Sequence, residues 1–257
     1  MRLFSAGLTD KGLRRPGNED SLVCRDDLGL YMVADGMGGH AAGEVASGTA
    51  VEVVTKYVQQ SLNELTIITD SSPTSTTPRE VYGKIIVDAV LTANEQICAQ
   101  SAQNSEWEGM GTTISGFLVQ GSLLWLAHVG DSRVYRLRGG ALEQLTDDHS
   151  WVNEQIRRKM LTPEEAKTHR WRNVITRALG HKLDLRVDAG MVKIVPEDIY
   201  LICSDGLTGM VDDPLIETIL KSFSYDLPSA CATLVQKANE AGGIDNITVI
   251  LLKAAGE

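Results

Sequence analysis

The chain has 257 residues, of which 43% are hydrophobic, so it is long enough to bury a substantial core in a single domain spanning residues 1–257. Asp and Glu outnumber Lys and Arg by 34 to 24, which gives a formal net charge of −10. A field of this sign repels the phosphates of nucleic acids and of anionic lipids, so neither is an expected partner.

The N-terminal segment and the cysteines indicate the compartment. Charged residues interrupt residues 1–17, so we expect no signal sequence, and no later run is long and apolar enough to be a membrane span. The four cysteines form no CxxC pair, which is typical of free thiols in a reducing compartment; they are Cys24, Cys98, Cys203 and Cys231. We therefore expect a cytoplasmic protein without disulfides, and a monomer.

The first part of the chain predicts one strand and two helices. Residues 30–34 form an apolar run, and apolar residues at helical spacing follow from Ala42 to Tyr57. Residues 69–77 are rich in Ser and Thr, which is typical of an exposed loop. A capping box with proline at the first helical position, Thr77-Pro78-Arg79-Glu80, then begins a second helix. Its buried stripe is expected to contain Ile85, Ile86, Ala89, Ala93 and Ile97.

From Gly111 the hydrophobic period changes to two, which predicts strands at 112–119, 123–129, 133–138 and 141–145, with Gly139-Gly140 as a tight hairpin turn. A polar segment near 147–181 follows, and a capping box at 162–165 predicts a partly helical flap over one edge. Further strands are expected at 186–195, 199–203 and 247–252, and further helices from Asp213-Pro214 and over 230–241. Because strands and helices are grouped, antiparallel sheets flanked by helices are favoured over a parallel sheet.

One pattern recurs at places far apart in the chain, where an apolar run ends at an aspartate beside a glycine. With the acidic residues near other strands, the pattern covers Glu19, Asp20, Asp35-Gly36, Gly130-Asp131, Asp205-Gly206 and Asp245. A single Asp-Gly pair is typical of a turn. If these strand ends share one edge of a sandwich, however, the carboxylates repel one another unless a cation neutralises them. The candidates are all oxygen donors, which favours Mg²⁺ or Mn²⁺ over Zn²⁺.

Other motifs compete for the same residues. The segment Gly36-Met37-Gly38-Gly39-His40-Ala41 satisfies a dinucleotide-binding GxGxxA between a strand and a helix. That hypothesis requires a second parallel strand after the helix, but the helix runs into the Ser/Thr-rich loop and no such strand follows. It would also place the Asp35 carboxylate against a pyrophosphate, where the two negative charges repel each other. A Walker-type loop fails because Glu44 occupies the lysine position, and neither CxxxxxR nor GxSxG occurs in the sequence.

Taken together, these motifs resemble the protein phosphatase 2C, or PPM, family in its bacterial form. The matching blocks follow the family's order and span nearly the whole chain: residues 15–21, 33–39, 109–113, 129–133, 203–207 and 243–248. The resemblance implies an α+β fold, a four-layer α-β-β-α sandwich with metal ions at one edge. It also implies hydrolysis of phosphoserine and phosphothreonine on proteins, opposing a bacterial Ser/Thr kinase.

The resemblance implies a role for individual residues at the metal centre. Asp35 would bridge two metal ions, the Gly36 carbonyl would bind one of them, and Asp205 with Asp245 would complete the other site. Asp131, together with Asp205, matches a third and weaker metal site of bacterial relatives. The expected cofactors are therefore two Mn²⁺ or Mg²⁺ ions and a candidate third.

The remaining matches concern water and phosphate. Glu19 and Asp20 match positions that hold metal-bound water in the family, and Arg15 matches the residue that clamps the substrate phosphate. A guanidinium suits that task because it donates two parallel hydrogen bonds, although Arg15 also fits an ordinary surface charge. Two metal ions can lower the pKa of a bridging water toward neutrality, so the resemblance implies attack by hydroxide and no phosphoenzyme.

The general acid is open in the sequence. Eukaryotic members of the family have a histidine just after the Asp-Gly pair, whereas this chain has Met37. Metal-bound water is the first candidate, and His40 is a second. His149, where the flap begins, fits either a structural role or a substrate contact. A different class of function also stays open, namely a catalytically inactive module that keeps the fold and senses or scaffolds a partner.

Overall fold

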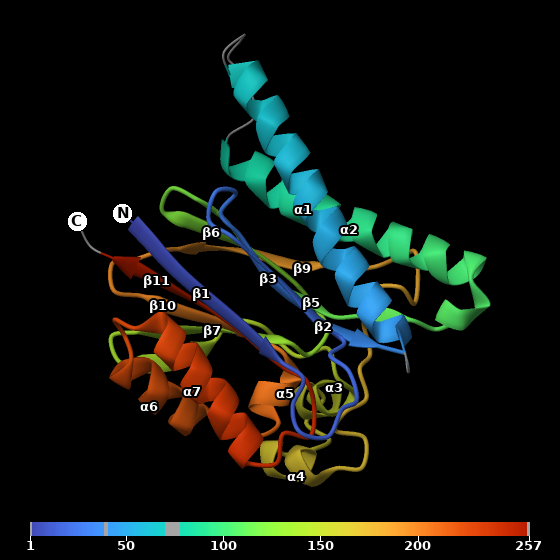
Figure 1. Cartoon of the computed structure of the whole chain (residues 1–257), viewed down its shortest axis with the longest axis vertical. Helices are drawn as coiled ribbons and strands as arrows, with labels where there is room; N and C mark the ends of the chain where they lie inside the picture. The colour runs from blue at the N-terminus through green and yellow to red at the C-terminus, as the bar shows by residue number, and fades with distance from the viewer. Residues whose placement is uncertain (1, 39–40, 70–77, 256–257) are drawn as a thin grey trace.

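Two antiparallel β-sheets stack face to face in the computed structural model, which describes residues 2–38, 41–69 and 78–255 (Figure 1). The first sheet has the strand order β1 (Arg2–Asp10), β11 (Ile247–Ala255), β10 (Ile199–Cys203), β7 (Arg133–Arg138) and β8 (Ala141–Gln144). The second has the order β2 (Asp20–Arg25), β3 (Leu30–Met37), β5 (Ile114–Gln120), β6 (Leu123–Val129) and β9 (Asp188–Lys193), and the short β4 (Gly111–Thr112) pairs with β3.

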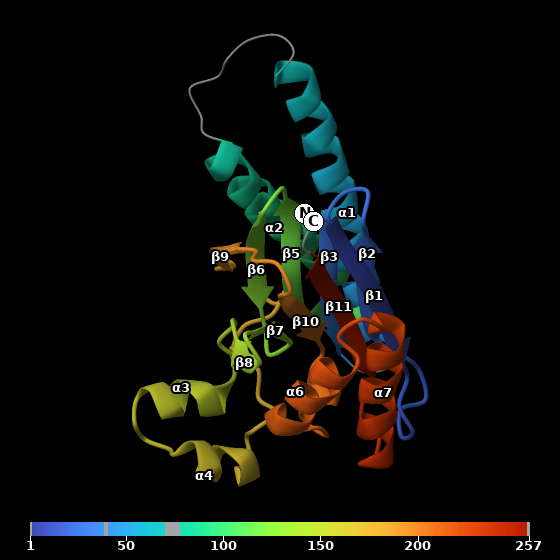
Figure 2. The same cartoon turned by 90° about the vertical axis from the view of Figure 1, so that its left-hand side faces the viewer.

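Helices cover the outer face of each sheet. The long helices α1 (Ala41–Thr69) and α2 (Pro78–Gln103) pack on the second sheet, while α6 (Asp213–Ser222) and α7 (Leu227–Glu240) pack on the first (Figure 2). The layers are helix, sheet, sheet and helix, so the predicted four-layer α+β sandwich is confirmed. Among the described helices, none combines the length and the apolar composition that a membrane crossing requires.

Burial on both faces explains why the central strands are apolar along their whole length. In β3, Met32 and Ala34 pack with the helices α1 and α2, whereas Tyr31 and Val33 face the first sheet. Between the sheets, Phe117 of β5 meets Tyr200 of β10 edge to face, with ring centroids 5.6 Å apart. A strand buried on both sides cannot alternate apolar with polar residues, so its sequence is a continuous apolar run.

The predicted flap at residues 147–181 is partly helical, as expected. It contains α3 (Trp151–Arg157) and α4 (Pro163–Thr168), and the capping box at residues 162–165 begins α4. Two isolated β-bridges hold the segment, one within the flap (Ser150↔Ile175) and one to β4 (Thr112↔Leu179). The flap is therefore attached to the strand that pairs with β3.

Several boundaries differ from the sequence prediction. The edge strand β1 was not anticipated because most of its side chains are exposed or half-buried, which weakens its hydrophobic pattern. The strand expected at 112–119 is divided into β4 and β5, and α7 begins at Leu227, where the Asp226 side chain accepts a hydrogen bond from the Ser229 amide at 3.2 Å.

The hairpin at Gly139-Gly140 is confirmed, with φ of 58° and 82°. The Ser/Thr-rich loop and Thr77 lie outside the described residues.

Candidate metal centre

A cleft of about 630 Å³ opens where the two sheets meet the flap. Its lining includes acidic residues from four separate parts of the chain, namely Glu19, Asp35, Asp205 and Asp245. Asp35 belongs to β3 of the second sheet, Asp205 begins α5 (Asp205–Thr208) directly after β10, and Asp245 lies just before β11. Folding thus brings together carboxylates that are up to 226 positions apart in the numbering from Glu19 to Asp245.

Backbone contacts fix Asp35 in the cleft wall. Its carbonyl accepts hydrogen bonds from the Thr113 amide and the Thr112 hydroxyl, both at 2.9 Å, and its own amide donates to Thr113 Oγ1 at 3.0 Å. On the other side, Asp35 pairs with Asp20 across β2 and β3. Because both neighbouring strands hold the backbone, the direction of the Asp35 side chain is determined by the sheet.

The carboxyl groups of Asp35 and Asp205 lie close enough to interact directly. Burial raises the pKa of Asp35 well above its usual value, and the charges of Asp20 and Asp205 raise it further. Burial and the charge of Asp245 likewise raise the pKa of Asp205, while a hydrogen bond with Asp35 acts in the opposite direction. Carboxyl groups in this arrangement share protons unless a cation replaces those protons.

Asp20 links the two sheets underneath the cleft. It is buried, and its Oδ2 accepts hydrogen bonds from Ser204 Oγ and Thr248 Oγ1, both at 2.7 Å. Its Oδ1 is buried without a hydrogen-bond partner among the described residues. Burial, more than the two neighbouring aspartates, raises the pKa of Asp20 to about 7. Ser204 and Thr248 stood within matching blocks of the sequence, but their hydroxyls were given no role, since serine and threonine beside or within an apolar strand carry no distinctive signal.

Asp131 lies behind the cleft and does not line it. It follows β6, is buried, and its Oδ1 also has no hydrogen-bond partner in the described part of the chain. Burial and then the charge of Asp205 raise the pKa of Asp131 to about 8. A buried carboxylate oxygen without a partner is costly, so this position suits a cation or an ordered water.

Arg15 lies at the rim of the cleft and bonds Asp245. The distance from its Nη2 to Asp245 Oδ2 is 2.6 Å, and the side chains are 46% and 33% exposed. Asn246 organises the loop that carries Arg15, because its Nδ2 donates to the Lys11 and Gly17 carbonyls and its Oδ1 accepts from the Glu19 amide. Asn246 was given no role at the site from the sequence, although its side chain holds the backbone beside Arg15 and Glu19.

The glycines of the Asp-Gly pairs are required by close approach of neighbouring backbone rather than by turn geometry. A Cβ at Gly36 would lie 2.1 Å from the Gly43 carbonyl oxygen, and a Cβ at Gly206 would lie 1.9 Å from the Asn246 carbonyl oxygen. Neither glycine has a positive φ. The simple turn explanation considered from the sequence is therefore wrong for these two pairs.

His149 is buried beneath the flap and does not line the cleft. Its Nδ1 accepts a hydrogen bond from the Gly130 amide at 3.0 Å, and its own amide donates to the Gly130 carbonyl at 2.7 Å. Its Nε2 lies 3.1 Å from Asp188 Oδ2, to which it donates because Nδ1 is the acceptor. Of the two roles left open by the sequence, the structural one fits this burial. His40 lies outside the described residues.

The donor set fits hard divalent cations such as Mn²⁺ and Mg²⁺. The predicted ligands offer carboxylate and carbonyl oxygens, and Asp20 Oδ1 and Asp131 Oδ1 are buried and without partners. Within the described residues, no three His, Cys, Asp or Glu side chains already stand in an arrangement that could hold a metal ion. Asp245 Oδ2 is engaged by the guanidinium of Arg15 at 2.6 Å.

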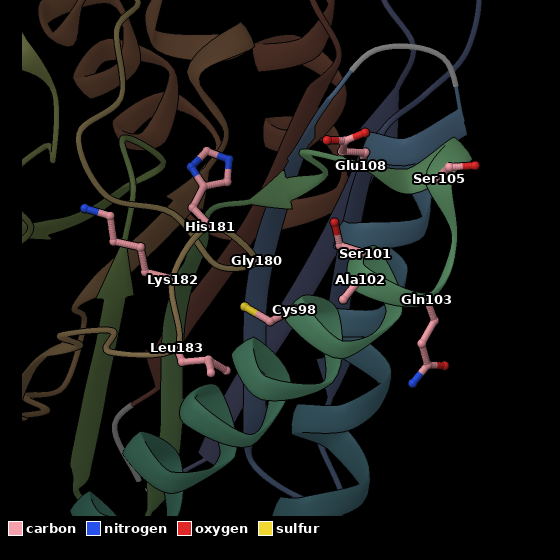
Figure 3. A pocket seen from close by; sticks show the side chains of 10 residues that line it. All are labelled: Cys98, Ser101, Ala102, Gln103, Ser105, Glu108, Gly180, His181, Lys182 and Leu183. Carbon is pink, nitrogen blue, oxygen red and sulfur yellow. The ribbon is translucent and has the colours of Figure 1, made fainter.

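A second hollow of about 710 Å³ lies on another face, between the end of α2 and the loop after the flap (Figure 3). Cys98, Ser101 and Glu108 line one side of it, and His181 and Lys182 line the other. Among the described residues that line it, Glu108 is the one acidic group, so this hollow differs from the cleft with its converging carboxylates. Its larger volume does not make it the better candidate for metal chemistry.

Comparisons with known proteins agree with the fold. The sequence model of the protein phosphatase 2C family matches residues 16–239. Serine/threonine phosphatase stp of Listeria welshimeri is 37% identical over 248 residues, covering 95% of this chain and 93% of that protein. Protein phosphatase PhpP of Streptococcus pneumoniae is 38% identical over 251 residues, covering 95% of each chain.

Solved structures give the same result. The Mycobacterium tuberculosis serine/threonine phosphatase PstP/Ppp has a TM-score of 0.85 at 35% identity, with 99% of each chain covered. The catalytic domain of PstP in complex with two manganese ions has a TM-score of 0.83, also at 35% identity and 99% coverage of each chain. The matched family model, the related sequences and the shared sandwich lead to one assignment: this chain belongs to the protein phosphatase 2C family.

Proposed function

We propose that this protein hydrolyses phosphoserine and phosphothreonine esters on proteins, using divalent metal ions held in the cleft. The observation that carries the proposal is the convergence of Asp35, Asp205 and Asp245 from distant parts of the chain beside Arg15. Relatives named as serine/threonine phosphatases match nearly the whole chain. The acidic set is complete, and nothing supports the inactive binding module that the sequence left open.

We assign the metal ligands as follows. Asp35 and the Gly36 carbonyl would hold one ion, and Asp35 with Asp205 and Asp245 would hold the other. The crystal structure of the PstP catalytic domain with two manganese ions supports a centre with two metal ions. Asp131 with Asp205 would hold a third ion, which the buried Asp131 Oδ1 without a partner among the described residues favours. Mn²⁺ and Mg²⁺ both suit these oxygen donors.

The chain's own groups prepare the reaction around those ions. When bound, the two ions supply an activated water and offset charge on the transferring phosphoryl group. Arg15 stands at the rim, where its guanidinium can leave Asp245 and donate two hydrogen bonds to phosphate oxygens. Glu19 and Asp20 hold the surrounding water, and Ser204 and Thr248 keep Asp20 in place. Met37 offers no proton, so we assign protonation of the leaving oxygen to water in the cleft.

The cellular setting is part of the same proposal. The whole chain acts as one catalytic domain, residues 1–257, and works as a monomer in the cytoplasm. Its substrates are phosphoproteins, and it opposes a Ser/Thr kinase that phosphorylates them. The negative charge of the molecule and the free cysteines support this setting, because they disfavour nucleic-acid partners and an oxidising compartment.

Hydrolysis of p-nitrophenyl phosphate and of a phosphothreonine peptide tests the proposal. We expect turnover of both with Mn²⁺ and loss of turnover with EDTA, because the carboxylates alone repel a phosphate dianion. Restoring Mn²⁺ after EDTA removal should recover the activity. Failure of the purified protein to hydrolyse either compound with Mn²⁺ would reject the function, as would hydrolysis that EDTA leaves unchanged.

A further inference from the structure

The flap carries a charge opposite to that of the rest of the molecule. Residues 157–172 include six Lys and Arg but only two Asp and Glu, in a chain whose formal net charge is −10. Arg157 pairs with Asp147, and Arg158 pairs with Glu154 at 3.8 Å. The other four basic residues are exposed and form no ion pair with any described residue: Lys159, Lys167, Arg170 and Arg172. The flap therefore presents a basic surface, on which several positively charged side chains are available to bind a negatively charged partner.

An aromatic cluster fixes part of this surface. The Trp151 ring stacks on His169, with centroids 4.8 Å apart, and meets Trp171 edge to face at 4.6 Å. The Arg170 guanidinium carbon lies 4.6 Å above the Trp171 ring, and Trp171 is 41% exposed. Stacking on a ring holds an arginine in place while its donors stay available.

The same segment leads directly into the cleft. The Val174 amide donates to the Trp171 carbonyl at 3.1 Å, and the Trp151 amide donates to the Val174 carbonyl at 2.8 Å. Asn173 and Ile175, on either side of Val174, line the cleft. Because an extended peptide spans about 3.3–3.6 Å per residue, positions a few residues from a phosphoresidue in the cleft reach the flap.

The geometry points to a docking surface on the basic flap segment, formed mainly by Lys167, Arg170 and Trp171. We infer that it binds acidic residues on either side of the phosphoresidue of a protein substrate. The inference rests on the proposed function and names its substrate class. The rest of the molecule is negatively charged and repels an acidic peptide, so attraction at the cleft edge comes from the flap. The carboxylates of the peptide pair with Lys167 and Arg170, and its apolar atoms cover the Trp171 ring.

Two phosphothreonine peptides of equal length test the inference, one with Asp and Glu around the phosphothreonine and one with Gln and Ala. At low ionic strength we expect kcat/KM of the wild type to be about tenfold higher for the acidic peptide. The preference should largely disappear at about 0.5 M salt, where the Debye length falls well below the ~10 Å at 0.1 M.

The double variant Lys167→Gln/Arg170→Gln should lower kcat/KM for the acidic peptide about fivefold. Hydrolysis of the neutral peptide and of p-nitrophenyl phosphate should not change, because neither compound has negatively charged residues beside its phosphate group that could bind the flap. A control with the same loss of charge, Lys56→Gln/Lys84→Gln, changes α1 and α2. The C-terminal end of α1 and the N-terminal end of α2 lie at the opposite end of the molecule from α3 and α4 (Figures 1 and 2). This control should keep the preference for the acidic peptide.

Each other outcome overturns the inference in a recognisable way. Equal turnover of the two peptides by the wild type would reject the docking surface while leaving the phosphatase function intact. An equal loss of kcat/KM for the acidic peptide in the two double variants would show that the net charge of the protein, and not the flap, causes the preference. Flap-dependent binding to phosphatidylserine vesicles or to RNA, without a peptide preference, would assign the flap to another anionic partner. Absence of turnover with every substrate would reject the proposed function, and the inference with it.

Discussion

At the scale of single residues, the two aspartates in direct contact should be the least replaceable groups in the cleft. Asp35→Asn and Asp205→Asn each remove a negative donor that we assign to the metal ions, and the amide keeps nearly the same shape. We expect turnover with saturating Mn²⁺ to fall at least ~10³-fold while the far-UV circular dichroism spectrum stays unchanged. Activity near that of the wild type in either variant would remove that residue from the proposed ligand set.

Gly36 provides a sharper test of backbone placement. A methyl group there would meet the Gly43 carbonyl oxygen at 2.1 Å, so Gly36→Ala must displace either β3 or the first turn of α1. We expect at least a hundredfold loss of kcat together with weaker activation by Mn²⁺, because the Gly36 carbonyl moves away from its assigned metal site. Gly48→Ala is a matched control, since no atom beyond its own stretch of helix lies within 4 Å of the added carbon, and it should retain full activity.

His149 acts at a distance from the reacting groups. Its neutral ring connects the Gly130 amide to Asp188, and Gly130 directly precedes Asp131. We expect His149→Ala to raise the Mn²⁺ concentration needed for half-maximal activity severalfold, because the loop that carries Asp131 loses its anchor. His149→Gln, which can accept the Gly130 hydrogen bond, should restore part of the response. An unchanged Mn²⁺ titration for His149→Ala would confine this residue to flap stability.

At the scale of secondary-structure elements, the stability of the sandwich depends on its apolar contacts. Ile86 of α2 is fully buried against the second sheet. We expect Ile86→Ala to lower the free energy of unfolding by about 2–5 kcal/mol, because it removes buried methyl groups and leaves a cavity. Urea unfolding measures that change. The folded fraction should keep its kcat, since the cleft lies at the edge of the sheets and not under α2; a large loss of kcat would show that the helix also positions the centre.

The elements differ in how well the sequence predicted them. The strand of residues 199–203 and the helix with the stripe from Ile85 to Ile97 were correct because burial on a defined face leaves a strong period. The edge strand β1 was missed because it is exposed and depends on pairing with β11, which lies more than 230 residues away. Local periodicity carries no information about such a distant partner.

The candidate site shows the same division. Asp35, Asp131 and Asp205 could be singled out because each lies beside a glycine after an apolar run, and Asp245 because it lies just before one. The hydrogen bonds from Ser204 and Thr248 to Asp20, and from Asn246 to the loop of Arg15, could not be predicted because they join segments that meet only in three dimensions. The pairing of Arg15 with Asp245 was also beyond the sequence, since no local pattern relates the two positions.

At the scale of the whole molecule, the buried carboxylates make stability depend on pH and on metal. Burial raises the pKa of Asp20 from its usual 3.8 to about 7, so the metal-free folded protein holds a proton between these pH values that the unfolded chain has lost. Stability of the metal-free protein must therefore fall as the pH rises from about 4 to 7. Asp131, with a pKa of about 8, extends the effect to higher pH.

Thermal unfolding measures this dependence. In EDTA we expect the Tm at pH 8 to be about 5 °C or more below that at pH 5.5, since each shifted pKa unit corresponds to about 1.4 kcal/mol. Saturating Mn²⁺ at pH 8 should restore the Tm, because ligand binding to the folded state replaces the missing protons. The variant Asp20→Asn, compared with the wild type, should show a smaller decrease of Tm between pH 5.5 and pH 8 in EDTA. A Tm in EDTA that rises from pH 5.5 to 8 would contradict the raised pKa values.

The pairing of β1 with β11 has a consequence for how the enzyme comes into existence. Strand β1 is synthesised early, yet its partner is completed only when residue 255 has been added, and the same late segment brings Asp245 to Arg15. Contacts of such long sequence separation form slowly, and the ribosome delays them further. A nascent or prematurely terminated chain therefore has no finished cleft, so phosphatase activity begins only after translation has passed the last strand.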